Sequence, residues 1–139
     1  MTIYARKKIV LFKLETTYGE DPTPTGAADA IQTSNFKWMP MQGKDVERDL
    51  EQPHMGAQGT LPSELHAKVT FDVELEPSGV VGTPPAWSPL LRACAVAETI
   101  VAGTSVTYNP VSDGHESATL YFGLSGTKYV THGARGNVT

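Results

Sequence analysis

The fold is decided by one stretch of eleven residues, His66-Ala67-Lys68-Val69-Thr70-Phe71-Asp72-Val73-Glu74-Leu75-Glu76. Apolar side chains occupy its odd-numbered positions and polar side chains its even-numbered ones. Strict alternation is typical of a β-strand that has one face on a core and the other in water. The turn residues Pro77-Ser78-Gly79 follow directly. The stretch therefore predicts a strand from His66 to Glu76 in a one-sided antiparallel sheet.

Shorter apolar or alternating runs predict further strands on both sides of this stretch. They cover Lys8–Leu14, Ile31–Met41, Thr104–Tyr108, Glu116–Gly123 and Thr127–Thr131, and residues 133–139 look like the start of another strand. Turn residues between them predict turns at Asn109-Pro110, Asp113-Gly114 and Ser125-Gly126. Most of the chain is therefore expected to be β.

One helix is expected, over about residues 88–98. Ser88 suits an N-cap and Pro89 the first helical position. Its apolar stripe comprises Leu90, Ala93, Cys94 and Ala97, at the spacing i, i+3, i+4 and i+7. A helix of this length is marginal alone, so we expect it to pack on a sheet.

Two long segments lack a core-facing pattern. Residues 16–30 are rich in turn residues and predict a surface loop, and residues 43–62 are polar and predict a long inter-strand loop. The whole chain, 1–139, is expected to form a single domain with an N-terminal arm over 1–14. A continuation of the natural protein beyond residue 139 is left open. The predicted fold is mainly β, an antiparallel β-sandwich or open barrel with one short flanking α-helix.

The composition restricts the class of function. The chain has 139 residues and a net charge of −4. It therefore lacks the excess of cationic side chains that a nucleic-acid-binding surface needs. Its single cysteine, Cys94, cannot form an internal disulfide, which favours folding in the cytoplasm. No apolar run is long enough to span a bilayer, so we expect no membrane partner.

The sequence offers weak candidates for catalysis. Asp72, Glu74 and Glu76 form a carboxylate ladder whose neighbours are roughly 6.5–7 Å apart, near the separation used by inverting glycosidases. They lie on a wet face, however, where no carboxyl group is expected to have the raised pKa of a general acid. A solvated or functional acidic surface is the favoured interpretation.

Other reactive residue types also favour structural roles. The four histidines, at positions 54, 66, 115 and 132, show no metal-binding spacing. Cys94 is expected to be a small core residue, and Trp38, Trp87 and Phe36 are expected in a core or interface more than on a ligand platform. We predict no enzyme and no cofactor.

Three stretches together resemble the tail tube (major tail) proteins of long-tailed bacteriophages, including the Mu-like siphophage type. They are Glu15-Thr16-Thr17-Tyr18-Gly19 with the following Pro22-to-Ile31 segment, Pro85-Ala86-Trp87-Ser88-Pro89-Leu90-Leu91-Arg92-Ala93-Cys94, and Thr107-Tyr108-Asn109-Pro110-Val111-Ser112. The resemblance covers nearly the whole chain and depends on the order and spacing of the stretches.

The resemblance implies a virion protein, made and assembled in the host cytoplasm, whose homo-hexameric rings stack into the tail tube. Other tail proteins (tape measure, terminator and baseplate) would be its partners, and DNA would pass the lumen without specific binding. The implied lumen-facing residues are Lys68, Thr70, Asp72, Glu74 and Glu76. Ring-stacking candidates in the long loop are Lys44, Asp45, Glu47, Arg48, Asp49, Glu51 and His54, and inter-subunit arm candidates are Tyr4, Arg6, Lys7 and Lys8.

Other functions remain open at this stage. A tail terminator or a secretion-tube protein would share the same fold logic. A surface β-sandwich that binds a receptor or carbohydrate would expose Trp38, Trp87 or Tyr121 in a groove, and a glycosidase-like enzyme would need Asp72 and Glu74 in a cleft.

Overall fold

The computed structural model describes residues 8–124 and 126–139. The chain is mainly β, with antiparallel sheets and one short helix, which confirms the predicted class. It divides into two compact units, one containing residues 8–34 and 73–139 and the other residues 35–72. No helix in the described residues is long and apolar enough to cross a membrane. Closure of the sheets into a sandwich or barrel stays a prediction.

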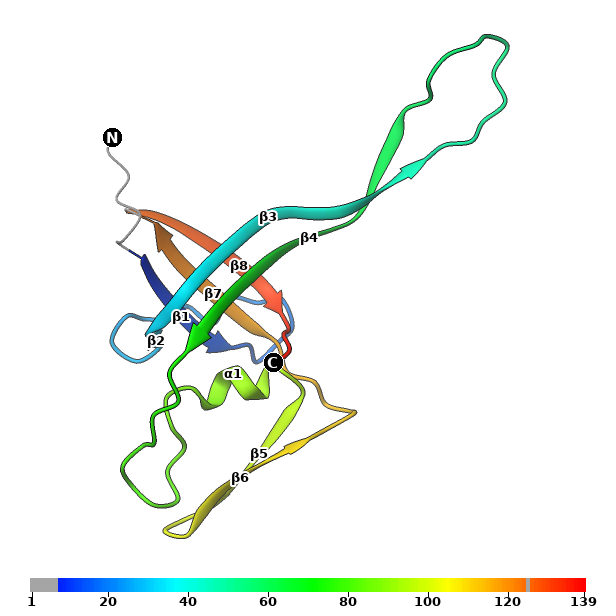
Figure 1. Cartoon of the computed structure of the whole chain (residues 1–139). Coiled ribbons are helices and arrows are strands. Elements are labelled where there is room, and N and C mark those ends of the chain that lie inside the picture. Colours follow the sequence, from blue (N-terminus) through cyan, green and yellow to red (C-terminus); the bar gives the residue numbers. More distant parts are fainter. Residues whose placement is uncertain (1–7, 125) are drawn as a thin grey trace. The chain divides into compact units, whose positions relative to one another are not determined.

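The first unit is built on a four-stranded sheet in the order β2-β1-β7-β8 (Figure 1). The strands are β1 (Lys8–Leu14), β2 (Ala30–Ile31), β7 (Ala118–Leu124) and β8 (Thr127–Ala134). The bounds of β1 match the prediction, β7 starts two residues late, and β8 runs three residues longer. Residues 15–29 hold no strand or helix, as expected for the first surface loop.

The core lies on the face of this sheet that carries alternate residues of β1 and β7. Val10 pairs with Phe122 and Phe12 with Leu120, and all four side chains are buried. On the other face of β7, Thr119 is fully buried as well. β7 is an inner strand, and its second face is covered by the 15–29 loop, where Glu15 and Asp21 accept hydrogen bonds from Thr119 and Tyr121.

The predicted helix over residues 88–98 was too long. Helix α1 covers only Ser88–Arg92, and a left-handed Ala95 (φ 59°) follows it. Residues 96–101 instead form β5 (Val96–Val101), which pairs with β6 (Ser105–Pro110). Val96, Ile100 and Val101 are β-branched, and cross-strand pairing outweighs the weak helical preference of so short a segment.

The ends of these elements also correct two finer predictions. Trp87, not Ser88, holds the N-cap position of α1, and the Ser88 hydroxyl instead donates to the Glu98 carboxylate. Pro110 ends β6 where a turn was expected, and it is tolerated there because an edge strand leaves one side of its backbone without a ladder partner.

The second unit is a ribbon of two long strands, β3 (Thr33–Glu47) and β4 (Thr60–Val73), each of which extends by one or two residues into the first unit. Figure 1 shows the ribbon ending in an open loop. β3 continues through Pro40 and past Met41, where the predicted strand ended, because a two-stranded ribbon has free outer edges that tolerate proline. The loop therefore spans only residues 48–59, much less than the predicted 43–62.

The C-terminal residues 135–139 form no strand, contrary to expectation. The N–H of Gly136 instead donates to the carbonyl of Ala93 at 3.1 Å, which ties this segment to the residue after α1. Of the predicted Ser125-Gly126 turn, Ser125 lies outside the described residues, and Gly126 has a positive φ of 91° that suits a turn.

Candidate functional site

The β3–β4 ribbon is fixed in register by contacts between side chains of its two strands. The rings of Phe36 and Phe71 stack with their centroids 6.4 Å apart. Next to them, the Asn35 amide donates to the Asp72 carboxylate at 2.6 Å. These pairs place each face of β3 beside the matching face of β4, so the ribbon has two chemically different sides.

One side of the ribbon is apolar. Phe36, Trp38, Val69 and Phe71 lie on it near the base and are half-buried. Because strand side chains alternate, Pro40, Leu65 and Ala67 continue the same face, and there they are exposed, Leu65 to 57%. An isolated two-stranded hairpin is only marginally stable in water and needs further packing. We therefore expect this exposed apolar strip to be covered by a partner.

The opposite side of the ribbon carries mostly polar side chains, with Met39 and the exposed Met41 among them, and holds part of the predicted lumen surface. Lys68, Thr70 and Asp72 are exposed on β4, as their alternation predicted. Glu74 and Glu76 are exposed but lie beyond the end of β4, so the predicted carboxylate ladder on a single strand was wrong. The regular strand stops at Val73, where the backbone leaves the ribbon for the first unit.

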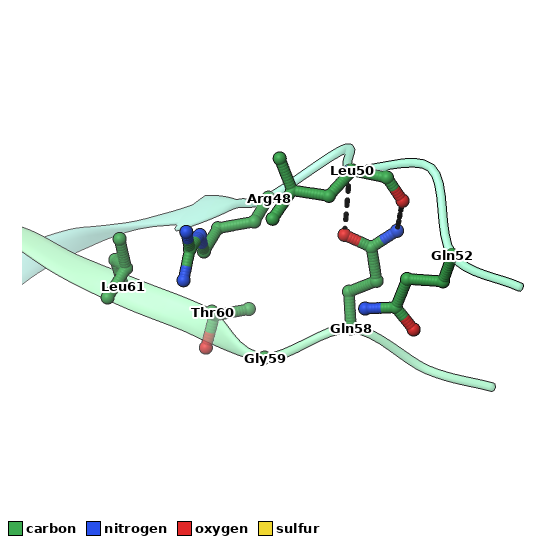
Figure 2. A pocket seen from close by; sticks show the side chains of 7 residues that line it. All are labelled: Arg48, Leu50, Gln52, Gln58, Gly59, Thr60 and Leu61. Atoms are coloured by element: carbon green, nitrogen blue, oxygen red, sulfur yellow. Dashed lines mark hydrogen bonds between the residues drawn. The ribbon is translucent and has the colours of Figure 1, made fainter.

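The loop at the end of the ribbon is closed by one side chain. The Gln58 amide accepts from the N–H of Leu50 at 2.8 Å and donates back to the Leu50 carbonyl, as Figure 2 shows. This pair imitates a rung of β-ladder and separates a small tip, residues 51–57, from the strands. Beyond this neck, Met55 is fully exposed, at 105% relative accessibility.

A small pocket of about 140 Å³ lies at the neck (Figure 2). Its lining consists of Arg48, Leu50, Gln52, Gln58, Gly59, Thr60 and Leu61. The volume is about that of a cavity that holds one benzene ring. It is too small for most ligands, which occupy roughly 300–1,000 Å³.

The structure divides the predicted ring-stacking residues between strand and loop. Lys44, Asp45 and Glu47 are part of β3, which corrects their assignment to the loop. Arg48, Asp49, Glu51 and His54 lie in the loop, and all are exposed. Of the predicted arm residues, Tyr4, Arg6 and Lys7 lie outside the described residues, and Lys8 is the first residue of β1.

A second pocket, of about 460 Å³, lies on the four-stranded sheet and was not predicted. It is lined by Ile9, Leu11, Tyr121 and Gly123 on one face of β1 and β7, with Lys8, Phe122, Gly126, Thr127 and Lys128 around them. Ile9 stands opposite Gly123 and is 54% exposed. The sequence signal was a glycine within an apolar inner strand, which leaves a gap in the sheet surface.

The most highly bonded polar group described is the carboxylate of Glu15, directly after β1. It accepts hydrogen bonds from the N–H groups of Gly19 (2.8 Å) and Gly133 (2.7 Å) and from the hydroxyls of Ser117 and Thr119 (both 2.6 Å). Burial alone would raise the pKa of Glu15, but the four bonds outweigh it and lower the pKa to about 2. The ionised carboxylate thus fastens the 15–29 loop to β7 and β8.

Sequence reasoning missed this cluster, although Glu15 and Gly19 belong to one of the stretches quoted above. Ser117 and Thr119 lie about a hundred positions away, so only the fold brings them together. Thr119 is also 3.2 Å from Nδ1 of His132. Because the only hydroxyl proton of Thr119 is donated to Glu15, Nδ1 of His132 must be the donor in that contact.

Next to Glu15, the same loop covers Tyr121 of β7. The Tyr121 hydroxyl donates to the Asp21 carboxylate, and the ammonium of Lys128 lies 3.5 Å from the ring centroid. This hydrogen bond lowers the pKa of Asp21 and raises the pKa of Tyr121. Tyr121 is only 8% exposed, which disfavours it as an open binding platform.

The other aromatic and ionic candidates have structural partners as well. Trp87 donates to the carbonyl of Glu76 at 2.8 Å and packs on Tyr108, with centroids 5.6 Å apart. Arg92 binds Glu116 through two hydrogen bonds of 2.6 and 2.7 Å, and this contact raises the pKa of Arg92. Neither pair leaves a free reactive group.

Among the described residues, no three His, Cys, Asp or Glu side chains gather as metal ligands. Burial raises the pKa of the half-buried Cys94 thiol, which disfavours the reactive thiolate. The carboxylates of Asp72 and Glu74, which a glycosidase would need in a cleft, are exposed.

The fold and these surfaces define a mainly β protein whose distinguishing feature is the long ribbon with a partly exposed apolar face. Comparison of the chain with protein-family models, with curated proteins and with solved structures finds no match.

Proposed function

We propose that this chain is a structural subunit that assembles with copies of itself into rings stacked as a bacteriophage tail tube. The proposal combines the resemblance of three sequence stretches to tail tube proteins with one structural observation. That observation is the β3–β4 ribbon, two strands of 15 and 14 residues whose apolar face continues into exposed apolar side chains, interrupted by Gln42 and Lys44, over its outer half.

Such a ribbon is expected to need a partner. Two-stranded hairpins are marginal alone, and long strands with free edges tend to pair with other chains. Leu61 and Leu65 are more than half exposed on β4, and Val46 is 47% exposed on β3. Covering these side chains in an oligomer would remove apolar surface from water and stabilise the ribbon.

A second copy is the favoured partner because the resemblance to tail tube proteins implies self-assembly. The ribbon of one copy would then contact a different surface of the next copy. Contacts of this heterologous kind close into rings or continue into tubes. The surface binding module is less favoured, since Trp87 and Tyr121 have intramolecular partners where an open aromatic groove was required.

The proposal is tested by negative-stain electron microscopy of the purified protein over rising concentration, with light scattering for mass. We expect rings or hollow tubes wide enough for duplex DNA. A Leu65→Asp variant should abolish them, because it places a charge on the apolar face. Thr70→Asp, a matched change on the polar face, should not. A wild-type protein that remains monomeric at every concentration would refute assembly.

A further inference from the structure

The tip of the ribbon, residues 51–57, has properties that suit it to binding in an apolar pocket. Met55 is fully exposed, and methionine is flexible and polarisable, which suits it to filling an irregular apolar pocket. The two hydrogen bonds between Gln58 and Leu50 hold the neck of the loop closed. Less conformational entropy is therefore lost when the tip binds.

The sheet pocket has matching properties. Its floor contains Ile9, Leu11 and Gly123, and its volume of about 460 Å³ is several times that of a cavity that holds a benzene ring. A Met side chain with part of its loop fits such a space. No Cβ fills it at Gly123, where an added methyl group would come within 3.2 Å of the Ile9 side chain.

The charges around the two features are complementary. Asp49 and Glu51 lie on the approach to the tip, while Arg48 lies at the neck, so residues 48–57 have a net charge of −1 with His54 neutral. Lys8 and Lys128 line the pocket, and Asp21, which is bonded to Tyr121, attracts Lys128, so these three groups together carry a net charge of +1. Opposite charges around an apolar contact orient the partners and suppress wrong pairings.

We propose that Met55 of one copy inserts into the Ile9–Leu11–Gly123 pocket of a second copy. This inference rests on the proposed function and specifies one of its joints. Because the tip and the pocket are different surfaces, each copy offers one of each, and the contact can repeat along an assembly.

Two single variants should each break the joint from one side. Met55→Asp puts a charge on the tip, and Ile9→Asp puts a charge into the pocket, and both residues are exposed enough for the fold to tolerate the change. For an interface anchor, the protein concentration needed for tubes should rise by about 30-fold or more. Val138→Asp, at an exposed apolar position outside both features, serves as the matched control and should assemble like wild type.

Mixing the two variants gives a result that general destabilisation cannot give. The Met55→Asp copy retains a working pocket and the Ile9→Asp copy a working tip, so one joint can form between them but cannot continue. Light scattering should then show particles of twice the mass that either variant forms alone. Circular dichroism of each variant checks that it is folded.

A covalent version tests the contact itself. Met55→Cys and Ile9→Cys, mixed under mild oxidation, should give a mixed disulfide between positions 55 and 9, identified by peptide mass, in higher yield than the disulfides that each variant forms with itself or through the native Cys94. Wild-type-length tubes from Met55→Asp or Ile9→Asp, or a mixture without mass doubling and without the disulfide, would overturn the inference while leaving tube assembly intact. Failure of the wild type to assemble would instead remove the proposed function and this joint with it.

Discussion

Replacing Glu15 by Gln tests whether the carboxylate cluster holds the first unit together. Glu15 accepts four hydrogen bonds, two on each oxygen, from Gly19, Ser117, Thr119 and Gly133. Gln keeps one accepting oxygen but turns an NH₂ group toward two of the donors. Hydrogen bonds to a charged group contribute about 1.5–3 kcal/mol each, and unsatisfied buried donors cost a similar amount. We expect the variant to lose about 2–4 kcal/mol of unfolding free energy.

The assay is urea denaturation at pH 7 and at a concentration too low for assembly. The midpoint should fall without a change in m-value, and the melting temperature should drop by about 10 °C. Glu20→Gln, an exposed change in the same loop, removes the same charge and should leave the unfolding free energy within about 0.5 kcal/mol of wild type. A Glu15→Gln midpoint that coincides with wild type would refute the role given to the cluster.

The pH dependence separates the charge from the shape of Glu15. Its pKa is 4.5 in the ordinary state and about 2 in the folded protein, so its ionised form stabilises the fold above pH 4.5. That contribution is lost as the pH falls toward 2. The full shift corresponds to about 3 kcal/mol, and solvent screening of the part-exposed carboxylate reduces it to about 1–2 kcal/mol. The difference in unfolding free energy between wild type and Glu15→Gln should therefore decrease by this amount as the pH falls from about 5 to about 2.

Two further changes test local geometry. Gly82→Ala should cost at least about 2 kcal/mol in urea denaturation, because φ is +74° and the new Cβ would clash with the backbone N of Gly103. Gly79→Ala, also at positive φ but in open space, should cost only about 1 kcal/mol, and equal losses would contradict the close contact. Gln58→Ala removes the hydrogen bonds to Leu50 that close the loop neck. It should raise the protein concentration needed for tubes several-fold while the melting temperature stays within about 2 °C of wild type. Unchanged assembly would contradict the role given to the closed neck.

The class of fold and its strongest strands could be predicted because their signals are local. Lys8–Leu14 was found residue by residue, and the alternation from Lys68 to Val73 correctly separated half-buried from exposed side chains. Period-two alternation depends only on which face of the strand meets apolar surroundings. It can therefore be recognised in the sequence without knowing the neighbouring strands.

Other elements could not be predicted because distant partners determine them. Val96–Val101 shows a helical spacing at its start, yet pairing with β6 makes it a strand once Ala95 turns the chain. The same limit applies to the sites. The Glu15 cluster joins residues about a hundred positions apart, and the pocket at Gly123 exists only because Ile9 of β1 lies opposite it.

The structure also changes what the tube hypothesis must explain about DNA. Acidic repulsion was expected from one strand face, but near the base of the ribbon that face combines Lys37 and Lys68 with Asp72, whose carboxylate is bonded to Asn35. By the same alternation, Asp45 and Glu47 lie on this face farther out, and both are exposed. The base of the face, with two cations and one bonded acid, does not by itself repel phosphates. Any lumen that excludes DNA by charge would therefore depend on Asp45, Glu47 and the acids that follow β4, and on how neighbouring copies place them.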